Sequence, residues 1–367
     1  MPPPAEFTPE TFDDLPGWAD DDHLAAFAAF RRSAIHAESK PYRSGSLGVR
    51  AEAFRPAFAI ALAASNVGAA EARDFFERHF RPFLVRPGGV TTGFVTGFYE
   101  PEAAASRTRT EEYRFPIYAR PPDLIDIDDR NRPWGMEAAC RFGRMGDPEP
   151  VEYFDRREIE SGMLAGQGLE LAWLADRVDL FFIHIQGAAR LVLPDGDVMR
   201  ITYAAKSGHP FTGIGRVLAE LGEIPLDQVT MQTIRAWLAA NPARLDEILW
   251  QNRSFIFFRE HPVEDEGLGP VAAAKVQLTA GRSMAVDRLL HTFATPVFIH
   301  APTLRAFGTD GFRRLMIAQD TGSAIIGSAR GDLFTGSGHE AGQIAGVIRH
   351  DADFHVLVPT ELAETWI

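Results

Sequence analysis

Two aspartates that could exchange protons with a substrate lie close together in the segment AQDTGSAIIGSARGDLFTGSG, which runs from Ala318 to Gly338. Asp320 opens an Asp-Thr-Gly-Ser string of the kind used by aspartic proteases, in which two carboxylates share one proton and activate a water molecule. Asp332 lies in a glycine-rich stretch, and glycines let the backbone turn sharply or approach a ligand closely. The segment therefore predicts acid-base chemistry at one or both aspartates.

The protease interpretation requires two Asp-Thr-Gly or Asp-Ser-Gly strings, one from each lobe or from each subunit. The sequence before Asp320 contains no second string, and a homodimeric protease with one motif would be far shorter than 367 residues. We therefore reject an aspartic protease. For Asp332 alone, a turn-capping role in a loop remains as plausible as catalysis.

The composition argues against nucleic-acid binding, internal disulfides and cysteine-based metal sites. Hydrophobic residues make up 46% of the chain, and 37 Lys and Arg against 50 Asp and Glu give a formal charge of −13, which disfavours nucleic acid as a partner. The single cysteine, Cys140, excludes an internal disulfide and a cysteine-based zinc site, and no paired-histidine helix motif is present. We expect no metal and no cofactor.

No segment has the pattern of a signal peptide or of a membrane helix. The opening MPPPAEFTPE lacks a basic region followed by an apolar one, and it holds no lipid-anchor cysteine. The longest apolar runs, such as AFAIALAA at 57–64, fall well short of the roughly 18 residues that a membrane helix needs. We therefore expect no membrane-spanning helix.

The hydrophobic pattern predicts an α+β, β-rich fold. Helical spacing is expected near 24–35, 51–64 and 70–80, and two or three further helices over 211–252. Strand-like segments begin near residue 90 and are expected over 178–205, with a hairpin turn at Asp195-Gly196. The remaining short strands are expected at SFIFFRE, RSMAVDRLL, TPVFIHAP, RRLMIAQD, SAIIG and FHVLVP. Because strands and helices do not alternate, small barrels are favoured over a doubly wound sheet.

Five segments, taken in order, carry a resemblance to a known family. They are GFVTGFYEP (93–101), FFIHIQGAARL (181–191), TYAAKSGHPFTGIGRVL (202–218), GRSMAVDR (281–288) and MIAQDTGSAIIGSARGDLFTGSGHEAG (316–342). Together they resemble the MltA family of lytic transglycosylases, enzymes that cleave the glycan strands of peptidoglycan. The resemblance covers most of the chain from about residue 90 onward.

The resemblance implies a two-domain fold with a cleft between the domains. A double-psi β-barrel catalytic domain with a helical N-terminal part would be built from residues 1–101 and 266–367, and a second β-barrel domain would be inserted over 102–265. Asp332 would be the catalytic acid. Asp320 aligns with the other acid of the same signature, as a catalytic or a supporting partner.

The matched motifs also suggest residues that could contact the sugar chain. These are Thr96, Gly97, Tyr99, Gln186, Gly187 and Lys206. Tyr99 could stack on a sugar ring, Gln186 could bind an N-acetyl group, and Lys206 could meet a carboxylate of the lactyl or peptide stem. The alternatives are a core aromatic, a strand-end cap and a solvated lysine.

Two departures from the family pattern and two rival functions stay open. One departure is the missing lipid-anchor cysteine near the N-terminus, and the other follows the Ile-Gln-Gly string. After Ile185-Gln186-Gly187 the family usually continues Ser-Gly, but Ala188 and Ala189 follow here and remove a hydroxyl. The rivals are a hydrolytic glycosidase that uses Asp320 and Asp332 as an acid-base pair, and a non-catalytic peptidoglycan-binding protein. The expected partners are peptidoglycan glycan strands and possible cell-wall synthesis or division proteins; a monomer in the periplasm or cell envelope is expected.

Overall fold

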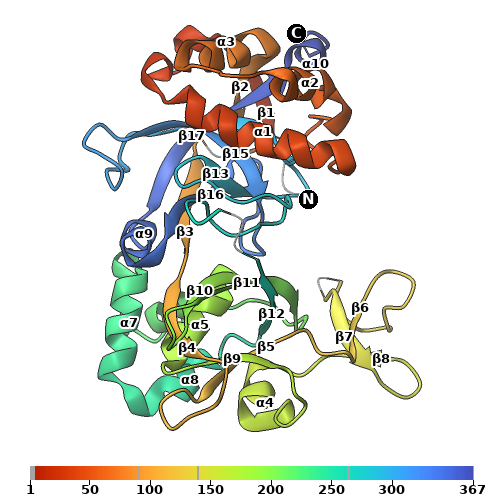
Figure 1. Cartoon of the computed structure of the whole chain (residues 1–367), viewed down its shortest axis with the longest axis vertical. Helices are drawn as coiled ribbons and strands as arrows, with labels where there is room; N and C mark the ends of the chain where they lie inside the picture. The colour runs from red at the N-terminus through yellow and green to blue at the C-terminus, as the bar shows by residue number, and fades with distance from the viewer. Residues whose placement is uncertain (1–4, 90, 139, 263–264, 367) are drawn as a thin grey trace. The chain divides into compact units, whose positions relative to one another are not determined.

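The chain folds into two compact units in a computed structural model that describes residues 5–89, 91–138, 140–262 and 265–366. Unit 1 consists of Met1–Tyr99 and Asp265–Ile367, and unit 2 consists of Glu100–Glu264. Each unit combines helices with strands (Figure 1). The predicted α+β, β-rich fold class is confirmed.

Unit 1 contains a helical layer and one large sheet. Its elements are β1 (Glu6–Pro9), α1 (His23–Ser39), α2 (Arg55–Ala63), α3 (Ala69–His79), β2 (Phe80–Arg86), β3 (Gly93–Glu100), β13 (Ser283–Val286), β14 (Pro296–Ala301), β15 (Phe312–Asp320), β16 (Arg330–Ser337), α9 (Gly338–Ala345), β17 (Arg349–Pro359) and α10 (Thr360–Ala363). The three predicted N-terminal helices are confirmed as α1, α2 and α3. A 3-10 turn over Ala51–Phe54 precedes α2.

The sheet of unit 1 closes on itself. Its strand order is β1-β2-β17-β14-β15-β13-β16-β3, and an additional β17–β3 pairing joins the strands from β17 to β3 into a ring. The β13–β15 pair is parallel, whereas β13 and β16 are antiparallel. The ring therefore sets β15 and β16 on either side of β13. The double-psi crossing of its strands stays a prediction.

The helices α1, α2 and α3 lie against this sheet (Figure 1). They pack on it through aromatic side chains. Phe30 of α1 is fully buried, and its ring lies 5.6 Å from that of Phe75 and 5.8 Å from that of Phe80. Each such burial contributes about 2 kcal/mol. Gln319, also fully buried, donates to the Ala29 carbonyl and to Ser33 Oγ of α1, both at 2.8 Å. The strand that ends in Asp320 is thus fixed to α1.

Unit 2 contains a six-stranded sheet, a small three-stranded sheet and several helices. Its elements are β4 (Glu102–Ser106), β5 (Phe115–Tyr118), β6 (Leu124–Asp126), β7 (Phe142–Met145), β8 (Pro150–Val151), α4 (Arg156–Glu158), β9 (Glu170–Leu174), α5 (Arg177–Gln186), β10 (Ala188–Val192), β11 (Val198–Lys206), α6 (Ile214–Glu220), α7 (Met231–Ala240), α8 (Leu245–Leu249) and β12 (Ile256–His261). The larger sheet has the order β12-β11-β10-β4-β9-β5, and a bridge between Ala119 and Phe258 brings its two ends together. The predicted hairpin at Asp195-Gly196 is confirmed, because β10 and β11 pair antiparallel around it.

Two strand predictions were wrong. The segment from Arg177 to Gln186 is the helix α5, whose N-terminus is capped by Asp176 Oδ1, which accepts from Val178 N at 2.6 Å and from Asp179 N at 3.0 Å. Both faces of α5 are buried, so its short apolar run carries no helical period. The segment SAIIG at 323–327 forms a turn, and its Ile326 is 73% exposed.

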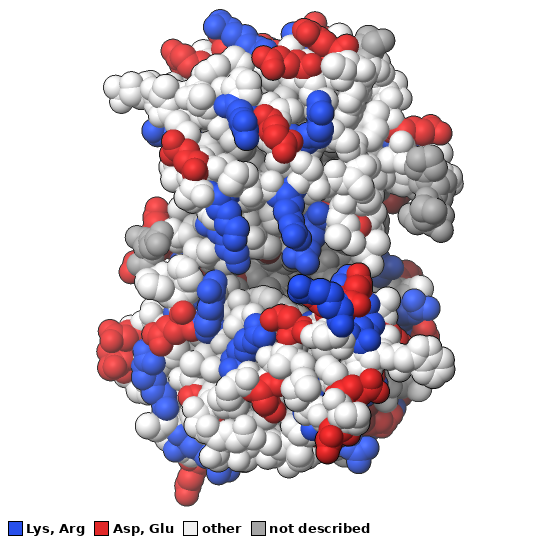
Figure 2. Space-filling model, turned by 90° about the vertical axis from the view of Figure 1, so that its right-hand side faces the viewer, with Lys and Arg blue, Asp and Glu red and all other residues white. Residues whose placement is uncertain are grey.

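The surface carries charges of both signs. On the face shown in Figure 2, the described Lys and Arg side chains are interspersed with Asp and Glu side chains. Such a face, together with the net charge of −13, does not favour a phosphate backbone as a ligand.

Candidate active site

The register of the unit 1 sheet places the two aspartates of the C-terminal motif on either side of one residue. Ala285 of β13 pairs with Asp320 of β15 and with Asp332 of β16. Since neighbouring strands lie about 4.8 Å apart, the Cα atoms of the two aspartates are separated by on the order of 10 Å. Residues opposite one another on adjacent strands share a face of the sheet. The register therefore places both aspartates on one face of the sheet, with a bulge in the β13–β15 pairing between Met284 and Ala285.

Asp332 is half-buried and receives a hydrogen bond from β3. Thr96 Oγ1 donates to Asp332 Oδ1 at 2.5 Å, and Arg330 Nη2 donates to the same Thr96 oxygen at 2.7 Å. The Arg330 guanidinium lies 5.5 Å from the centre of the Phe94 ring. The predicted sugar-contacting residue Thr96 is thus in direct contact with the predicted catalytic acid.

The environment of Asp332 favours its protonated form. Burial raises the pKa of this carboxyl above its ordinary value, while the Thr96 hydroxyl and the Arg330 charge act in the opposite direction. An aspartate with a raised pKa keeps its proton closer to neutral pH than an exposed one does. This is the property required of a general acid.

Asp320 is held by the backbone instead. Its Oδ1 accepts from Ala273 N at 3.1 Å, and burial raises the pKa of Asp320 to about 6 even though amides of Thr321 and Ala273 lower it. The negative charge of Asp332 adds to the rise. The two carboxyl groups are thus close enough for the charge of Asp332 to affect the pKa of Asp320.

Gly97 and Tyr99 have structural neighbours within unit 1. A Cβ at Gly97 would lie 2.7 Å from Ile348 Cδ1 and 2.9 Å from Ala345 Cα, so a glycine is needed where α9 crosses β3. The ring of Tyr99 is 7% exposed and packs on Gly342 of α9, where a Cβ would come within 2.8 Å of the ring. Their contact with sugar stays a prediction.

The other three predicted sugar-contacting residues lie in unit 2. Gln186 is the last residue of α5, and Gly187 ends that helix in the left-handed conformation with φ 76°. Glycine adopts this conformation without strain. Lys206 ends β11 opposite Ile256 of β12. Gln186 is therefore at a helix end, not at the strand end that the sequence suggested.

Arg330 is a site residue that the sequence interpretation missed. Side chains two residues apart on a strand point to the same face, so a strand assignment for this segment would have placed Arg330 beside Asp332.

No metal centre and no membrane helix emerge from the described part of the chain. Within it, no group of three or more His, Cys, Asp and Glu side chains could hold a metal ion. Among its helices, none is long and apolar enough to cross a membrane. Cys140 is a buried thiol whose pKa is raised by burial.

The chain is similar to two family models and to solved structures that cover nearly all of it. A model of the MltA specific insert domain matches residues 94–259, and a model of the 3D domain matches residues 282–358. A crystal structure of a membrane-bound lytic murein transglycosylase from Agrobacterium tumefaciens is 49% identical, with a TM-score of 0.92 over 99% of this chain and 100% of that chain.

Two Escherichia coli relatives are more distant. The membrane-bound lytic murein transglycosylase A of strain K12 is 32% identical over 261 residues, which cover 70% of this chain but only 62% of that protein. A crystal structure of E. coli MltA with bound chitohexaose is 25% identical, with a TM-score of 0.65 over 98% of this chain and 92% of that chain. The resemblance seen in the five sequence motifs is confirmed, and the chain belongs to the MltA family of lytic transglycosylases.

Proposed function

We propose that this protein is a peptidoglycan lytic transglycosylase with Asp332 as its acid and base. It cleaves the β-1,4 bond between N-acetylmuramic acid and N-acetylglucosamine and leaves a 1,6-anhydromuramic acid end. The observation that carries the proposal is a half-buried Asp332 of raised pKa, held by the Thr96 hydroxyl, in a chain of this family. The names of the relatives support the same reaction.

One carboxyl group is enough for this reaction. Protonated Asp332 donates its proton to the glycosidic oxygen, and the bond from that oxygen to C1 of the muramyl sugar breaks. The muramyl 6-hydroxyl oxygen then attacks C1, and ionised Asp332 accepts its proton. Water does not enter, whereas ordinary glycosidases activate water or form an enzyme-linked sugar with a second carboxylate.

The attack within one sugar lowers the barrier because no second reactant has to be bound. Effective molarities of well-held groups correspond to on the order of 7 kcal/mol or more. The protein has to hold the ring in the attacking conformation and to tolerate the ionised form of Asp332. The hydrogen bond from Thr96 supports that ionised form.

The substrate class follows from the relatives. Bound chitohexaose in the E. coli structure supports a glycan chain as the ligand of this protein. Peptidoglycan strands would place the protein in the periplasm or cell envelope, with cell-wall synthesis or division proteins as possible partners and a monomer as the working form. We retain 1–101 with 266–367 as catalytic domain and 102–265 as inserted domain, and the six predicted sugar contacts.

The test is mass spectrometry of muropeptides released from purified sacculi. We expect the wild-type protein to release anhydro-ended muropeptides, and Asp332→Asn to lose at least about a thousandfold in rate, as expected for removal of a general acid. Arg78→Gln on exposed α3 is the control and should keep the wild-type rate. An active Asp332→Asn protein, or a wild type without anhydro products, would refute the proposal.

A second candidate is a hydrolytic glycosidase with Asp320 and Asp332 as its two carboxylates. It is favoured by their shared pairing with Ala285 and by the raised pKa of each. Its products would carry a reducing end, which the same spectra distinguish by the mass of one water. A binding protein without activity would release nothing from sacculi.

A further inference from the structure

The hydroxyl of Thr96 lies between a cation and a carboxylate. Arg330 Nη2 approaches it at 2.7 Å from one side, and Asp332 Oδ1 lies at 2.5 Å on the other. Arg330 and Asp332 are neighbours on one strand face, but a hydroxyl from β3 bridges them. This arrangement fixes the direction of the Thr96 hydroxyl proton and, through it, the oxygen of Asp332 that carries a proton.

We infer that Arg330 is a positioning residue, which acts through Thr96 to reserve Oδ2 of Asp332 for the catalytic proton. The inference rests on the proposed function and adds to it the choice of carboxylate oxygen. Arg330 itself does not have to touch the sugar.

The argument starts from the hydrogen-bonding capacity of a threonine. Its hydroxyl carries one proton and two lone pairs. The guanidinium of Arg330 can only donate, so one lone pair of Thr96 accepts from it. The hydroxyl proton of Thr96 is then directed to Asp332 Oδ1, its other close partner. A proton on Oδ1 would face the hydroxyl proton, so protonated Asp332 carries its proton on Oδ2.

Oδ2 is also the oxygen that protein groups leave open. It accepts no hydrogen bond from any residue in the part of the chain that the structure describes, and the side chain of Asp332 is only half-buried. One oxygen is thus fixed and the other can exchange a proton with a ligand. The same division serves both halves of the reaction, because Oδ2 gives the first proton and takes the second.

Arg330 is itself rigidly held. Its Nη1 donates to the carbonyl oxygen of Gly331, and its guanidinium lies over the Phe94 ring of β3. The surroundings of Gly331 are closely packed, because a Cβ at this position would lie 2.5 Å from Met284 Sδ. A clamped arginine fixes the direction of the Thr96 hydroxyl better than a mobile lysine would.

The indirect contact suits a general acid better than an ion pair would. A guanidinium bonded directly to Asp332 would hold it ionised at neutral pH. Through the hydroxyl, the cation strengthens the Thr96 donor without removing the proton, since a donor that accepts from a cation is polarised. The bridge therefore helps Asp332 to lose its proton in the first step and to remain charged until the second.

The experiment measures kcat and KM over a pH series on a soluble glycan substrate, for Arg330→Gln, Thr96→Val, their double variant and Thr96→Ser. We expect Arg330→Gln to lower kcat about tenfold and to leave KM within about twofold, as for loss of one charge-assisted contact. In Arg330→Gln, the decrease of kcat at high pH should occur about half a pH unit higher than in the wild type, because the pKa of Asp332 is higher without the arginine charge. Thr96→Ser should retain activity within about threefold, since serine supplies the same hydroxyl.

The double variant is decisive, because residues that act through one another are not additive. We expect the kcat of the double variant to lie within about twofold of that of Thr96→Val, because only the direct charge of Arg330 on Asp332 is left to lose. Additive losses, an unmoved pH profile, or a change in KM at constant kcat would each overturn the inference. If the wild type forms no anhydro product or Asp332→Asn stays active, the proposed function fails instead, and Arg78→Gln controls for a general loss of charge.

Discussion

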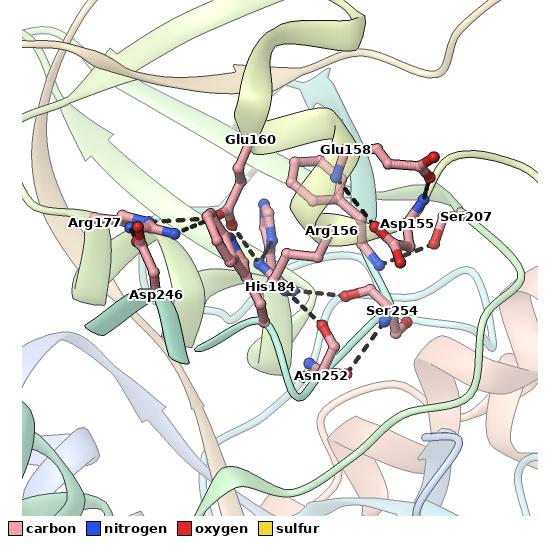
Figure 3. A network of polar contacts seen from close by, with 12 residues as sticks. Asp155, Arg156, Glu158, Glu160, Arg177, His184, Ser207, Asp246, Asn252 and Ser254 are labelled. Atoms are coloured by element: carbon pink, nitrogen blue, oxygen red, sulfur yellow. Dashed lines mark hydrogen bonds and ion pairs between the residues drawn. The ribbon is translucent and has the colours of Figure 1, made fainter. Parts of the chain in front are cut away.

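Arg156 of unit 2 and Arg330 of unit 1 each lie near a carboxylate, and their hydrogen-bond partners differ. In unit 2, Arg156 is fully buried, and its Nε donates to the Asn252 carbonyl at 2.9 Å and its Nη2 to the Ser254 carbonyl at 2.6 Å (Figure 3). Its Nη1 bonds Glu160 Oε1 at 3.1 Å and His184 Nδ1 at 3.0 Å. Arg330 in unit 1 bonds a hydroxyl and one carbonyl.

The difference separates a structural cation from a positioning one. Arg156 ties backbone carbonyls of the segment before β12 to α4 and α5, and its guanidinium lies 4.8 Å from the Phe181 ring and 5.3 Å from the Phe255 ring. Glu160 is likewise occupied, by Arg177 at 2.5 Å and Trp250 Nε1 at 3.0 Å. The carboxylate near Arg330 keeps one oxygen open. We call the Arg156 network saturated because both oxygens of Glu160 are bonded, although the buried Nε2 of His184 has no hydrogen-bond partner among the described residues. A carboxylate with both oxygens bonded stabilises the fold, whereas one with an open oxygen can exchange a proton.

The largest expected effect is on the saturated network. Arg156→Met should lower the free energy of unfolding by about 3–5 kcal/mol, because it leaves the Asn252 and Ser254 carbonyls and Glu160 Oε1 without their buried donor, while Glu160 Oε2 keeps Arg177 and Trp250. Chemical denaturation followed by tryptophan fluorescence measures the loss. The remaining folded protein should still release anhydro-ended muropeptides.

Arg78→Met is the matched control, because Arg78 is a solvent-exposed arginine with a side chain 74% exposed. It should change stability by no more than about 0.5 kcal/mol. An Arg156→Met protein as stable as the control would show that the unit 2 network contributes no more than a surface ion pair.

A smaller effect is expected at Asp320, the second acid of the site. Its pKa is raised to about 6 in the folded protein, so folding favours its protonated form. The associated stability is fully present below about pH 4 and is lost as the pH rises through 6. Asp320→Asn should therefore be more stable than the wild type at pH 8, by about 1–2 kcal/mol after allowance for partial exposure, and equal to it near pH 4.

Thermal melts of both proteins at the two pH values measure this difference. Asparagine keeps an oxygen that can accept from Ala273 N, so the fold should be preserved. A difference that does not change with pH would mean that Asp320 is ionised in the folded protein at little cost. Asp320 would then resemble Glu160 of unit 2, a carboxylate bonded to arginines, more than Asp332 with its raised pKa.

The family motifs in the sequence named Asp332 and Thr96 as candidate site residues, and their roles in the reaction stay predictions. That Thr96 contacts Asp332 could not be derived, since the contact depends on β3 pairing into a sheet with strands more than 200 residues away. Arg330 was missed because its role depends on the strand face that it shares with Asp332.

Burial on both faces explains the main error in secondary structure. The run from Leu180 to His184 is buried throughout, so neither a helical nor a strand period marks it. The capping aspartate before it was the available signal, because Asp176 accepts from two backbone amides of the first turn. The helix α3 was predicted correctly because its exposed residues Glu71, Asp74 and Arg78 give it a polar face, whereas α2 exposes Ala59 and Ile60 and has no such face.

The smallest expected effect concerns His184 and has the opposite pH sign to that of Asp320. Burial and the charge of Arg156 lower the pKa of His184 well below 6.5, so the folded protein excludes the proton that the unfolded chain binds. The contribution of His184 to stability is complete above about pH 6.5. Below that pH it falls, by at most about 1.4 kcal/mol per pH unit.

His184→Asn removes this titration, and the asparagine amide oxygen can accept a hydrogen bond from Arg156. The stability gap between wild type and His184→Asn, measured by urea unfolding, should therefore shrink by about 1 kcal/mol between pH 7.5 and pH 5.5. A constant gap would mean that His184 titrates normally, and that the saturated network of unit 2 admits a proton as readily as the open one of unit 1.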